Sequence, residues 1–345
     1  MKINKKIIAK LPVCYCVAPL VYKGKPHFLV GSEQDHPCLL FDREGNQVAQ
    51  IWDRPGGNMS MVQIPGSDGA FLAIRRFYSP DRGKDASIYL VWEEGGTWKN
   101  KVVAKLPCLH RIDILTRGGK SWVIACCLKS GYEYDGDWRF PGKTWVCNLP
   151  DDLSEDGKML PPFTPLLDNM LENLGYSRDV QDGIMSGIVS CKSGTYRFTP
   201  PEEGEEWTVE KICGDPASDA RLIDLDGCGQ KELVTISPFH GDTVAVYKLQ
   251  NGMYQKVWEY ERKVPLAHAI TVGMICGQPT AVIGYRNGDR DLFFITYEEG
   301  YKVTVADHDI GPTNVMFFQT GEKNVLIAAN REINEVAYYT FEEDA

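Results

Sequence analysis

The strongest constraint on the fold is an internal repeat, in which two runs rich in β-branched and aromatic residues flank a polar loop. Residues 233–247, 281–295 and 325–339 have this form, and a shorter apolar run precedes each of them. Runs of this composition without helical periodicity predict antiparallel strands. Seven such units, about 40–60 residues apart, are typical of the blades of a β-propeller. The preceding runs begin at Cys14, Asn58, His110, Asn173, Asp219, His268 and Pro312.

The sequence also predicts how the ring closes. Residues 6–12 (KIIAKLP) match residues 101–107 (KVVAKLP), which read as an outer strand leading into the next unit. We therefore expect a strand at residues 5–11 to complete the last blade, because a closed ring leaves no sheet edge exposed. The prediction is an all-β, seven-bladed β-propeller, closed by its N-terminal strand, that forms a single domain over residues 1–345. An insertion at 149–174 is expected to contain a short helix at 165–173.

Composition limits the partners and the compartment. The net charge is -10 and the pI about 5.2, which argues against nucleic acid or an anionic membrane as a main partner. We find neither an apolar run of about 18 residues nor a signal peptide, and so expect a cytoplasmic protein. Eleven cysteines without C-x-x-C spacing are interpreted as buried free thiols in a reducing compartment. Those within apolar runs are Cys14, Cys16, Cys126, Cys127, Cys191 and Cys276.

Strand topology predicts a functional face. Because consecutive strands of a blade are antiparallel, the start of the innermost strand and the loop between the second and third strands lie on one face. This places His110, His268 and His240 together, three of only six histidines in the chain. Alternatively, each is an isolated loop or capping histidine. Other residues expected near the same rim are Asn58, Asn173, Tyr176, Asp219, Arg76, Arg286 and Asn330.

An acidic loop follows the innermost strand of the fifth unit. Asp224, Asp226 and Glu232 occur in a D-x-D-G-x-G-x-x-E pattern that resembles calcium-binding loops of FG-GAP or VCBS-type propellers. Cys228 stands where those loops usually carry a further oxygen ligand, so one ligand is missing. The alternative is a tight turn held by side-chain to backbone hydrogen bonds. In either case the loop lies on the face opposite the histidines and is structural.

Several segments resemble the propeller domain of fungal aldos-2-ulose dehydratase. They are residues 106–115 (LPCLHRIDIL), residues 224–242 with the motif Pro-Phe-His-Gly-Asp, and Ala267–His268, within a similarity that spreads from about residue 50 onward. The resemblance implies a metal-dependent carbohydrate lyase that removes water from a keto sugar such as 1,5-anhydrofructose or glucosone. The divalent metal is left open among Zn, Mg and Ca.

A dehydration beside a ketone needs a base, an electrophile and an acid. One assignment makes His240 and His268 a metal-binding or electrophilic pair and His110 the base. A competing assignment puts all three histidines on one zinc, with Asp219 or Tyr176 carrying the proton. Asn58, Arg76, Arg286 and Asn330 are candidates for binding sugar hydroxyls. The alternative function is a non-catalytic propeller that binds a protein or glycan.

Overall fold

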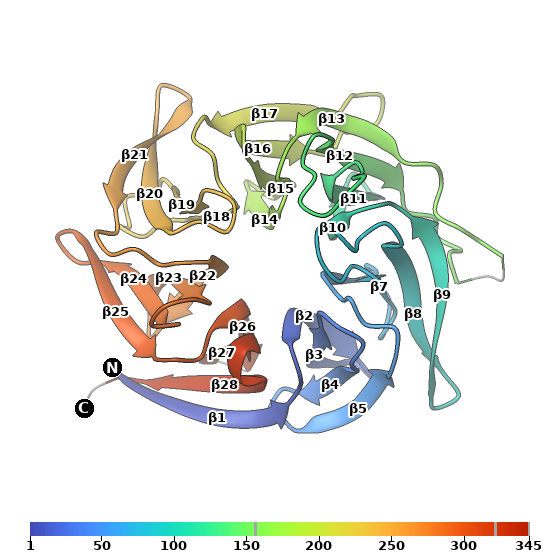
Figure 1. Ribbon diagram of the computed structural model, residues 1–345, viewed down its shortest axis with the longest axis horizontal. Coiled ribbons are helices and arrows are strands. Elements are labelled where there is room, and N and C mark those ends of the chain that lie inside the picture. The colour runs from blue at the N-terminus through green and yellow to red at the C-terminus, as the bar shows by residue number, and fades with distance from the viewer. Residues whose placement is uncertain (155–156, 321–322, 344–345) are drawn as a thin grey trace.

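The computed structural model describes residues 1–154, 157–320 and 323–343, and over these ranges the chain is an all-β β-propeller (Figure 1). The described part contains 28 strands and one short 3-10 helix, η1 at Arg331–Ile333. The sheets stand around a common centre with their first strands innermost. None of the helical structure in these ranges is long and apolar enough to span a membrane.

Five of the sheets have four strands each. Their bounds are β2–β5 at Cys14–Tyr22, Lys25–Ser32, Cys38–Asp42 and Gln47–Trp52; β6–β9 at Met61–Gln63, Phe71–Arg75, Ser87–Glu94 and Thr97–Lys105; β10–β13 at Leu109–Arg117, Lys120–Lys129, Pro141–Asn148 and Thr164–Met170; β22–β25 at Ala267–Ile275, Gln278–Tyr285, Leu292–Tyr297 and Tyr301–Asp307; and β26–β28 with β1 at Pro312–Thr320, Lys323–Asn330, Glu335–Glu342 and Lys2–Lys10.

The remaining eight strands form one sheet in two halves. The outer strands of the halves, β17 and β21, are joined by a single parallel residue pair, Cys213 with Tyr254. The first half has β14–β17 at Gly175–Gln181, Ile184–Cys191, Gly194–Thr199 and Thr208–Cys213, and the second has β18–β21 at Asp219–Ile223, Glu232–Ser237, Thr243–Gln250 and Met253–Glu259.

The second strands of the sheets are mostly apolar because neighbouring sheets pack against both of their faces. Strand β7 (FLAIR) is buried at every position, whereas most residues of the outer strand β9 (TWKNKVVAK) are exposed or half-buried. A strand covered on both sides needs no alternation of apolar and polar residues. The contacts between neighbouring sheets form the core. Phe28 of β3, which stacks on its strand partner Phe41 at 5.2 Å, meets Phe318 of β26 in the next sheet edge-on at 5.3 Å.

The first strand of the chain pairs with the last. Strand β1 runs antiparallel to β28 from Lys2 opposite Glu342 to Lys10 opposite Glu335, with an irregularity between Ile7 and Ala9. Figure 1 shows β1 as the outermost strand of that sheet. The backbone of Leu11 then donates a hydrogen bond to the carbonyl of Asn334 at 3.0 Å. The predicted N-terminal strand is therefore present and occupies the outer edge of the C-terminal sheet.

Two local predictions were wrong. The segment expected to be helical forms strand β13 (Thr164–Met170), because it pairs with β12 as the outer edge of its sheet. Cys276 is exposed, since it lies in the tight turn between β22 and β23 with a φ of +46°. All eleven cysteines are free, and nine are buried, including the other five assigned to apolar runs.

Deleting residues 1–11 should strongly destabilise the protein, because the backbone groups and the apolar face of β28 would lose their cover. We expect a fall in Tm several times larger than the roughly 2–4 °C that 1 kcal/mol produces in a large domain. Thermal unfolding followed by circular dichroism measures this change. A synthetic peptide of residues 1–11 added to the truncated protein should restore part of the loss. An unchanged Tm in the truncated protein would contradict this role for β1.

Candidate functional site

Three inner strands carry an irregularity at the same place, close to where each begins. The pairing register shifts between Cys14 and Cys16 in β2, between Leu109 and Arg111 in β10, and between Ala267 and Ala269 in β22. A bulge adds one residue to a strand and redirects its side chain. The skipped residues are Tyr15, His110 and His268.

These three side chains meet at one point. The hydroxyl oxygen of Tyr15 lies 3.2 Å from Nε2 of His110 and 3.2 Å from Nε2 of His268. Both imidazole rings stand nearly perpendicular to the phenol ring, at 90° and 81°. Only 2 % of Tyr15, 2 % of His110 and 6 % of His268 is exposed. We call this group the Tyr15 cluster.

The hydrogen bonds of the cluster fix its tautomers. Nδ1 of His110 lies 3.2 Å from the carbonyl of Leu174, and Nδ1 of His268 lies 2.7 Å from the carbonyl of Thr313. A carbonyl can only accept, so each Nδ1 carries the proton and each Nε2 presents a lone pair. The single hydroxyl proton of Tyr15 can be donated to only one of the two Nε2 atoms. The cluster therefore holds one more acceptor than its own protons can satisfy.

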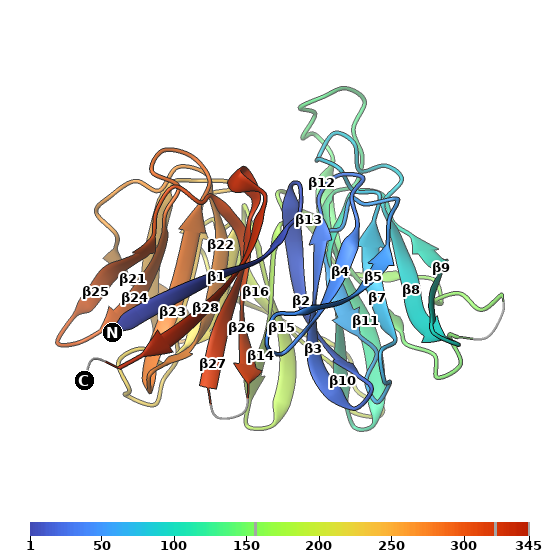
Figure 2. The same cartoon turned by 90° about the horizontal axis from the view of Figure 1, so that it is seen from below.

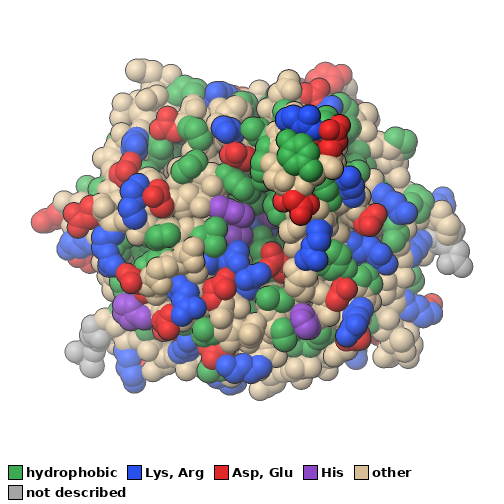
Figure 3. Space-filling view, viewed as in Figure 1, with side chains coloured by type: hydrophobic (Ala, Val, Ile, Leu, Met, Phe, Trp, Pro, Cys, Tyr) green, Lys and Arg blue, Asp and Glu red, His purple; other side chains and the backbone are tan. Residues whose placement is uncertain are grey.

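His240 stands beside the cluster and is more accessible. Its ring centroid lies 5.4 Å from that of His268, and its own ring stacks on Phe239 at 4.1 Å. Trp138, from the loop between β11 and β12, meets Phe239 edge-on at 5.2 Å. His240 is half-buried and has a left-handed φ of +45°. Figure 3 shows histidine side chains in the central hollow of this face, with charged side chains nearby.

Burial keeps these groups neutral near pH 7. It lowers the pKa of His110 and of His268 well below the usual value, with Arg111 and His240, respectively, as the next contributions. Burial, aided by Arg286, lowers the pKa of His240 to about 4. Burial also raises the pKa of Tyr15 to about 12. The arrangement offers neutral imidazoles as proton acceptors and a phenol that retains its proton.

The nitrogen atoms of the three histidines are not grouped closely enough to bind one zinc ion as predicted. Within the described ranges, the only group of three metal-ligating side chains with mutually close donor atoms is Asp224, Asp226 and Cys228. The Tyr15 hydroxyl stands between the Nε2 atoms of His110 and His268, where a shared ion would have to sit. Metal binding by His240 and His268 as a pair stays a prediction.

Two predicted proton carriers are engaged in ion-pair networks instead. The Tyr176 hydroxyl donates to Oδ2 of Asp113 at 2.8 Å, and Arg178 also binds Asp113. Asp219 accepts hydrogen bonds from Arg221, one of them at 3.2 Å. Among the described residues, no hydrogen bond joins Tyr176 or Asp219 to the three histidines. Both side chains are buried in the wall of the propeller and have structural partners.

The predicted asparagines lie in the interior of the protein. Asn58 and Asn330 are fully buried. Asn58 donates to the carbonyl of Ile74 at 2.8 Å, and Asn330 donates to the hydroxyl of Tyr339 at 3.4 Å. Asn173, expected at the rim, is buried in the same way and donates to the carbonyl of Lys143 at 3.1 Å.

The two predicted arginines differ in their relation to the histidines. Nε of Arg76 donates to the Tyr89 hydroxyl at 3.0 Å. Nε of Arg286 donates to Glu332 at 2.8 Å. Burial is the larger cause of the lowered pKa of His240, and the Arg286 charge lowers that pKa further. Of the predicted substrate-binding residues, Arg286 is therefore the one whose charge reaches the histidines.

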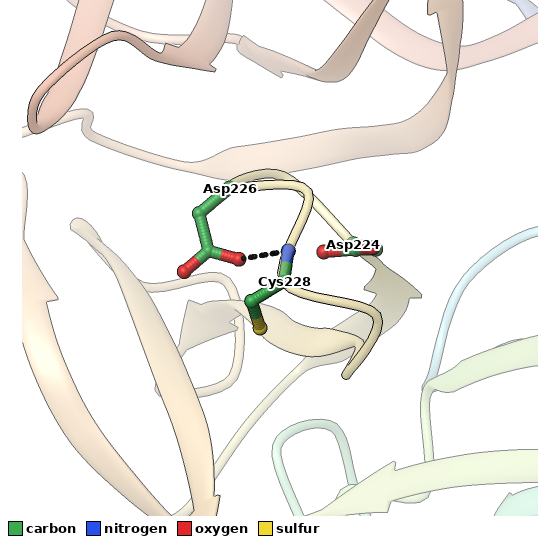
Figure 4. Close-up of side chains that lie close together, drawn as sticks. All are labelled: Asp224, Asp226 and Cys228. Atoms are coloured by element: carbon green, nitrogen blue, oxygen red, sulfur yellow. Dashed lines mark hydrogen bonds between the residues drawn. The ribbon is translucent and has the colours of Figure 1, made fainter.

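The acidic loop lies between β18 and β19, and its carboxylates already have partners in the protein. Oδ2 of Asp224 accepts from the backbone of Gly229 at 2.9 Å, and Oδ1 of Asp226 accepts from the backbone of Cys228 at 3.1 Å (Figure 4). Oε2 of Glu232 accepts from the backbone of Leu225 at 2.7 Å. These are the bonds expected of the turn alternative.

The side chain of Lys248 also neutralises the carboxylates of this loop. The Lys248 ammonium binds Oδ2 of Asp226 and lies 3.8 Å from Oε1 of Glu232. It lowers the pKa of Asp226 to about 2. Lys248 thus supplies positive charge where the resemblance implies a metal ion, and this arrangement favours the turn.

Tyr15 is the candidate site residue that sequence reasoning missed. The signal was a one-residue offset: Tyr15 follows Cys14 as His110 follows Leu109 and His268 follows Ala267. Aligning Cys14 itself with the histidines hid this equivalence. Trp138 and Phe239 were missed because their contact joins loops from distant parts of the chain, a relation that local sequence pattern does not carry.

Replacing Lys248 should turn the acidic loop into a calcium-sensitive element. Lys248→Ala leaves Asp226 and Glu232 without their counter-charge, so its Tm should fall and then rise again with millimolar Ca²⁺. The wild-type Tm should be the same in Ca²⁺ and in a chelator. The matched control is Lys256→Ala, whose partner Glu259 is on the exposed side of β21. A chelator that lowers the wild-type Tm would contradict the role of Lys248.

The lowered histidine pKa values predict acid sensitivity. Between the ordinary histidine pKa of about 6.5 and the folded value of about 4 for His240, the unfolded chain binds more protons than the folded protein. Stability is therefore complete above about pH 6.5 and falls as the pH decreases. His240→Asn should make the decline of Tm with pH shallower. Parallel curves for the variant and the wild type would contradict the pKa shift.

No family model and no curated protein sequence matches the chain. Solved structures match over nearly the whole length. The β-propeller domain of Myceliophteria thermophila Cps50 (Swd1) has a TM-score of 0.62 at 10% identity and covers 99% of this chain and 100% of its own. BBS1N in complex with ARL6DN has 0.60 at 13% over 99% and 96%. A putative 6-phosphogluconolactonase from Bacteroides fragilis has 0.57 at 12% over 96% and 91%. At these identities the likeness establishes the β-propeller fold.

Proposed function

We propose that this propeller is an acid–base catalyst that removes water from a hydroxylated carbonyl compound, a keto sugar in its most specific form. The observation that carries the proposal is the position of the Tyr15 hydroxyl, 3.2 Å from Nε2 of both His110 and His268. Two imidazole lone pairs and one phenolic proton within hydrogen-bonding distance are the elements of a proton relay. General acid–base groups of this kind contribute about 10²–10⁴-fold to a rate.

The proposed step is a β-elimination. An imidazole takes the proton from the carbon next to the carbonyl, and the C–H electron pair becomes the new C=C bond. The C–O bond on the adjacent carbon breaks, and the departing hydroxide takes a proton from the relay to form water. The imidazole then loses its proton to a water molecule and the relay regains one from water, so the protein ends in its starting state.

The roles follow from accessibility. His240 is the half-buried histidine of the group, and we assign it the contact with substrate at the mouth of the central hollow. His268 is next to it and connects through Tyr15 to His110. A lowered pKa keeps each imidazole unprotonated at neutral pH, although it also makes the free base weaker. Phe239 and Trp138 supply an aromatic wall beside His240 on which apolar faces of a sugar ring can pack.

The resemblance to aldos-2-ulose dehydratase supports the lyase chemistry and implies a divalent metal. The protonated Nδ1 atoms, each bound to a backbone carbonyl, are the outer contacts that metal-ligating histidines commonly make. A bound metal would polarise the substrate carbonyl. The three histidines do not form one ligand set, and the proton transfers proposed here require no metal. Metal analysis identifies any ion that is bound.

A binding propeller is the competing function, and one surface feature favours it. The loop between β11 and β12 projects above the face that carries the histidines (Figure 2). Tyr134 and Phe140 on this loop are 58% and 38% exposed, and the Arg139 guanidinium lies 5.3 Å from the centroid of each ring. Aromatic residues and arginine are enriched at protein interfaces. A protein or glycan partner would contact these residues, and catalytic turnover would then be absent.

We also propose a count of seven blades. The eight-stranded sheet is held together by one residue pair between β17 and β21, so we interpret its halves as two blades. With the five separate sheets this makes a ring of seven. The pairing of β1 with β28 supports closure of that ring by the N-terminal strand.

The lyase proposal predicts activity that depends on the relay. The wild type should convert 1,5-anhydrofructose or glucosone to an unsaturated ketone, detected by its ultraviolet absorbance. His240→Asn and Tyr15→Phe should each lower kcat/KM by about 10²–10⁴-fold without changing the circular dichroism spectrum. Full activity in both variants would contradict the relay.

The control variant is His308→Asn, since His308 is exposed and bonds Asp291 away from the cluster. Metal analysis of the wild type and of His240→Asn tests the metal prediction separately. If the wild type, supplied with Zn²⁺, Mg²⁺ or Ca²⁺, turns over no keto sugar, the binding function becomes the better explanation.

A further inference from the structure

A cavity lies next to the Tyr15 cluster, inside the central channel. The cavity, of about 790 Å³, is lined by the inner strands, among them β2, β10, β14, β18, β22 and β26. Its wall begins one residue after the cluster, because Cys16 follows Tyr15 and Arg111 follows His110. The inner strands that surround it face the centre of the ring in Figure 1.

Three arginines line this cavity, and two of them are neutralised. Arg178 binds the Asp113 carboxylate, with Nε 2.9 Å from Oδ2. Arg221 binds the Asp219 carboxylate on the same strand. Each of these guanidinium groups therefore has an acidic partner and also donates to a backbone carbonyl, that of Ile114 and that of Ala220, respectively.

The third arginine, Arg111, has no acidic partner within the described part of the chain. It is 91% buried, since its relative exposure is 9%. One hydrogen bond is recorded for its guanidinium, from Nη1 to the carbonyl of Met59 at 2.7 Å. A guanidinium carries five N–H donors and keeps its charge at any physiological pH. A buried cation with unused donors that lines a cavity is arranged to receive an anion.

Arg75 shows how this protein stabilises a buried arginine for structural purposes. Among the described residues, Arg75 also has no carboxylate partner, and it is only 1% exposed. Its guanidinium is sandwiched between Trp52 and Tyr89, with centroids at 4.4 and 4.6 Å, and it donates to Pro55 and Asn100. Such stacking compensates for lost hydration. Arg111 has no comparable aromatic pair in the described structure, and its surroundings lead into the cavity.

We propose that the central channel contains an oxyanion site at Arg111, which binds the carboxylate or phosphate group of a small polar molecule. The planar guanidinium fork suits both groups, which accept two parallel hydrogen bonds. The local positive charge contrasts with the net charge of -10 for the whole chain. The site is distinct from His240 at the mouth and requires no turnover, so it stands even if the dehydratase proposal fails.

Binding is tested by isothermal titration calorimetry at constant ionic strength, with four probes on the full-length protein. The probes are inorganic phosphate, gluconate, glucose 6-phosphate and neutral glucose. The oxyanion probes should bind and glucose should not. Gluconate and glucose 6-phosphate distinguish a carboxylate ligand from a phosphate ligand. Arg111→Gln should weaken the binding of the preferred anion about 10- to 100-fold.

Two further variants keep the test informative. Arg111→Lys retains the charge without the fork and should bind more weakly than the wild type, which also covers the case that Arg111→Gln does not fold. Arg43→Gln removes an exposed arginine paired with Glu44 at the outer edge and should bind as the wild type does. Equal binding by the Arg111 variants and the wild type, or no oxyanion binding by the wild type, would overturn the proposal.

Discussion

The structure depends on the packing of sheet against sheet around a centre. The second strand of a sheet is covered on both faces, so most of its residues are apolar, as in β7 and β11. The free energy of burying these runs holds the ring together, and pairing of β1 with β28 covers the edge that the C-terminal sheet would otherwise expose. Polar side chains are then confined to the channel, the loops and the outer strands. This confinement is why a few charged and titratable groups gather so closely at the centre.

The bulges near the start of the innermost strands position the side chains of the candidate site. Without a register shift, the residues at the start of an inner strand would follow the alternation that packs against neighbouring sheets. The extra residue in β2, β10 and β22 instead brings Tyr15, His110 and His268 to one point. The inner strand β26 shifts in the same place, where the carbonyl of the skipped Thr313 accepts from His268. A repeated backbone irregularity thus builds a site from four strands that are remote in sequence.

Much of the fold could be predicted because the repeat recurs along the whole chain. The outer strand expected around 101–107 corresponds to the end of β9 (Thr97–Lys105), and the strand expected at 5–11 corresponds to β1 (Lys2–Lys10). The segment 165–173 was misassigned because its local composition suits a helix, whereas the exposed edge of β12 pairs with it as a strand. Local propensity gives way where a neighbouring strand offers a full set of backbone hydrogen bonds.

The site was predictable only in part. The sequence alone determined the strand order and the shared face of His110, His240 and His268, because these follow from repeat length and strand topology. It left the acidic loop open between a calcium site and a turn. Tertiary structure decided the rest. It placed Tyr15 between two histidines, brought Lys248 to the acidic loop and, within the described ranges, left Arg111 without a carboxylate. Such facts depend on distances between side chains of different strands, and a linear pattern carries no information about which donors and acceptors meet once the ring has packed.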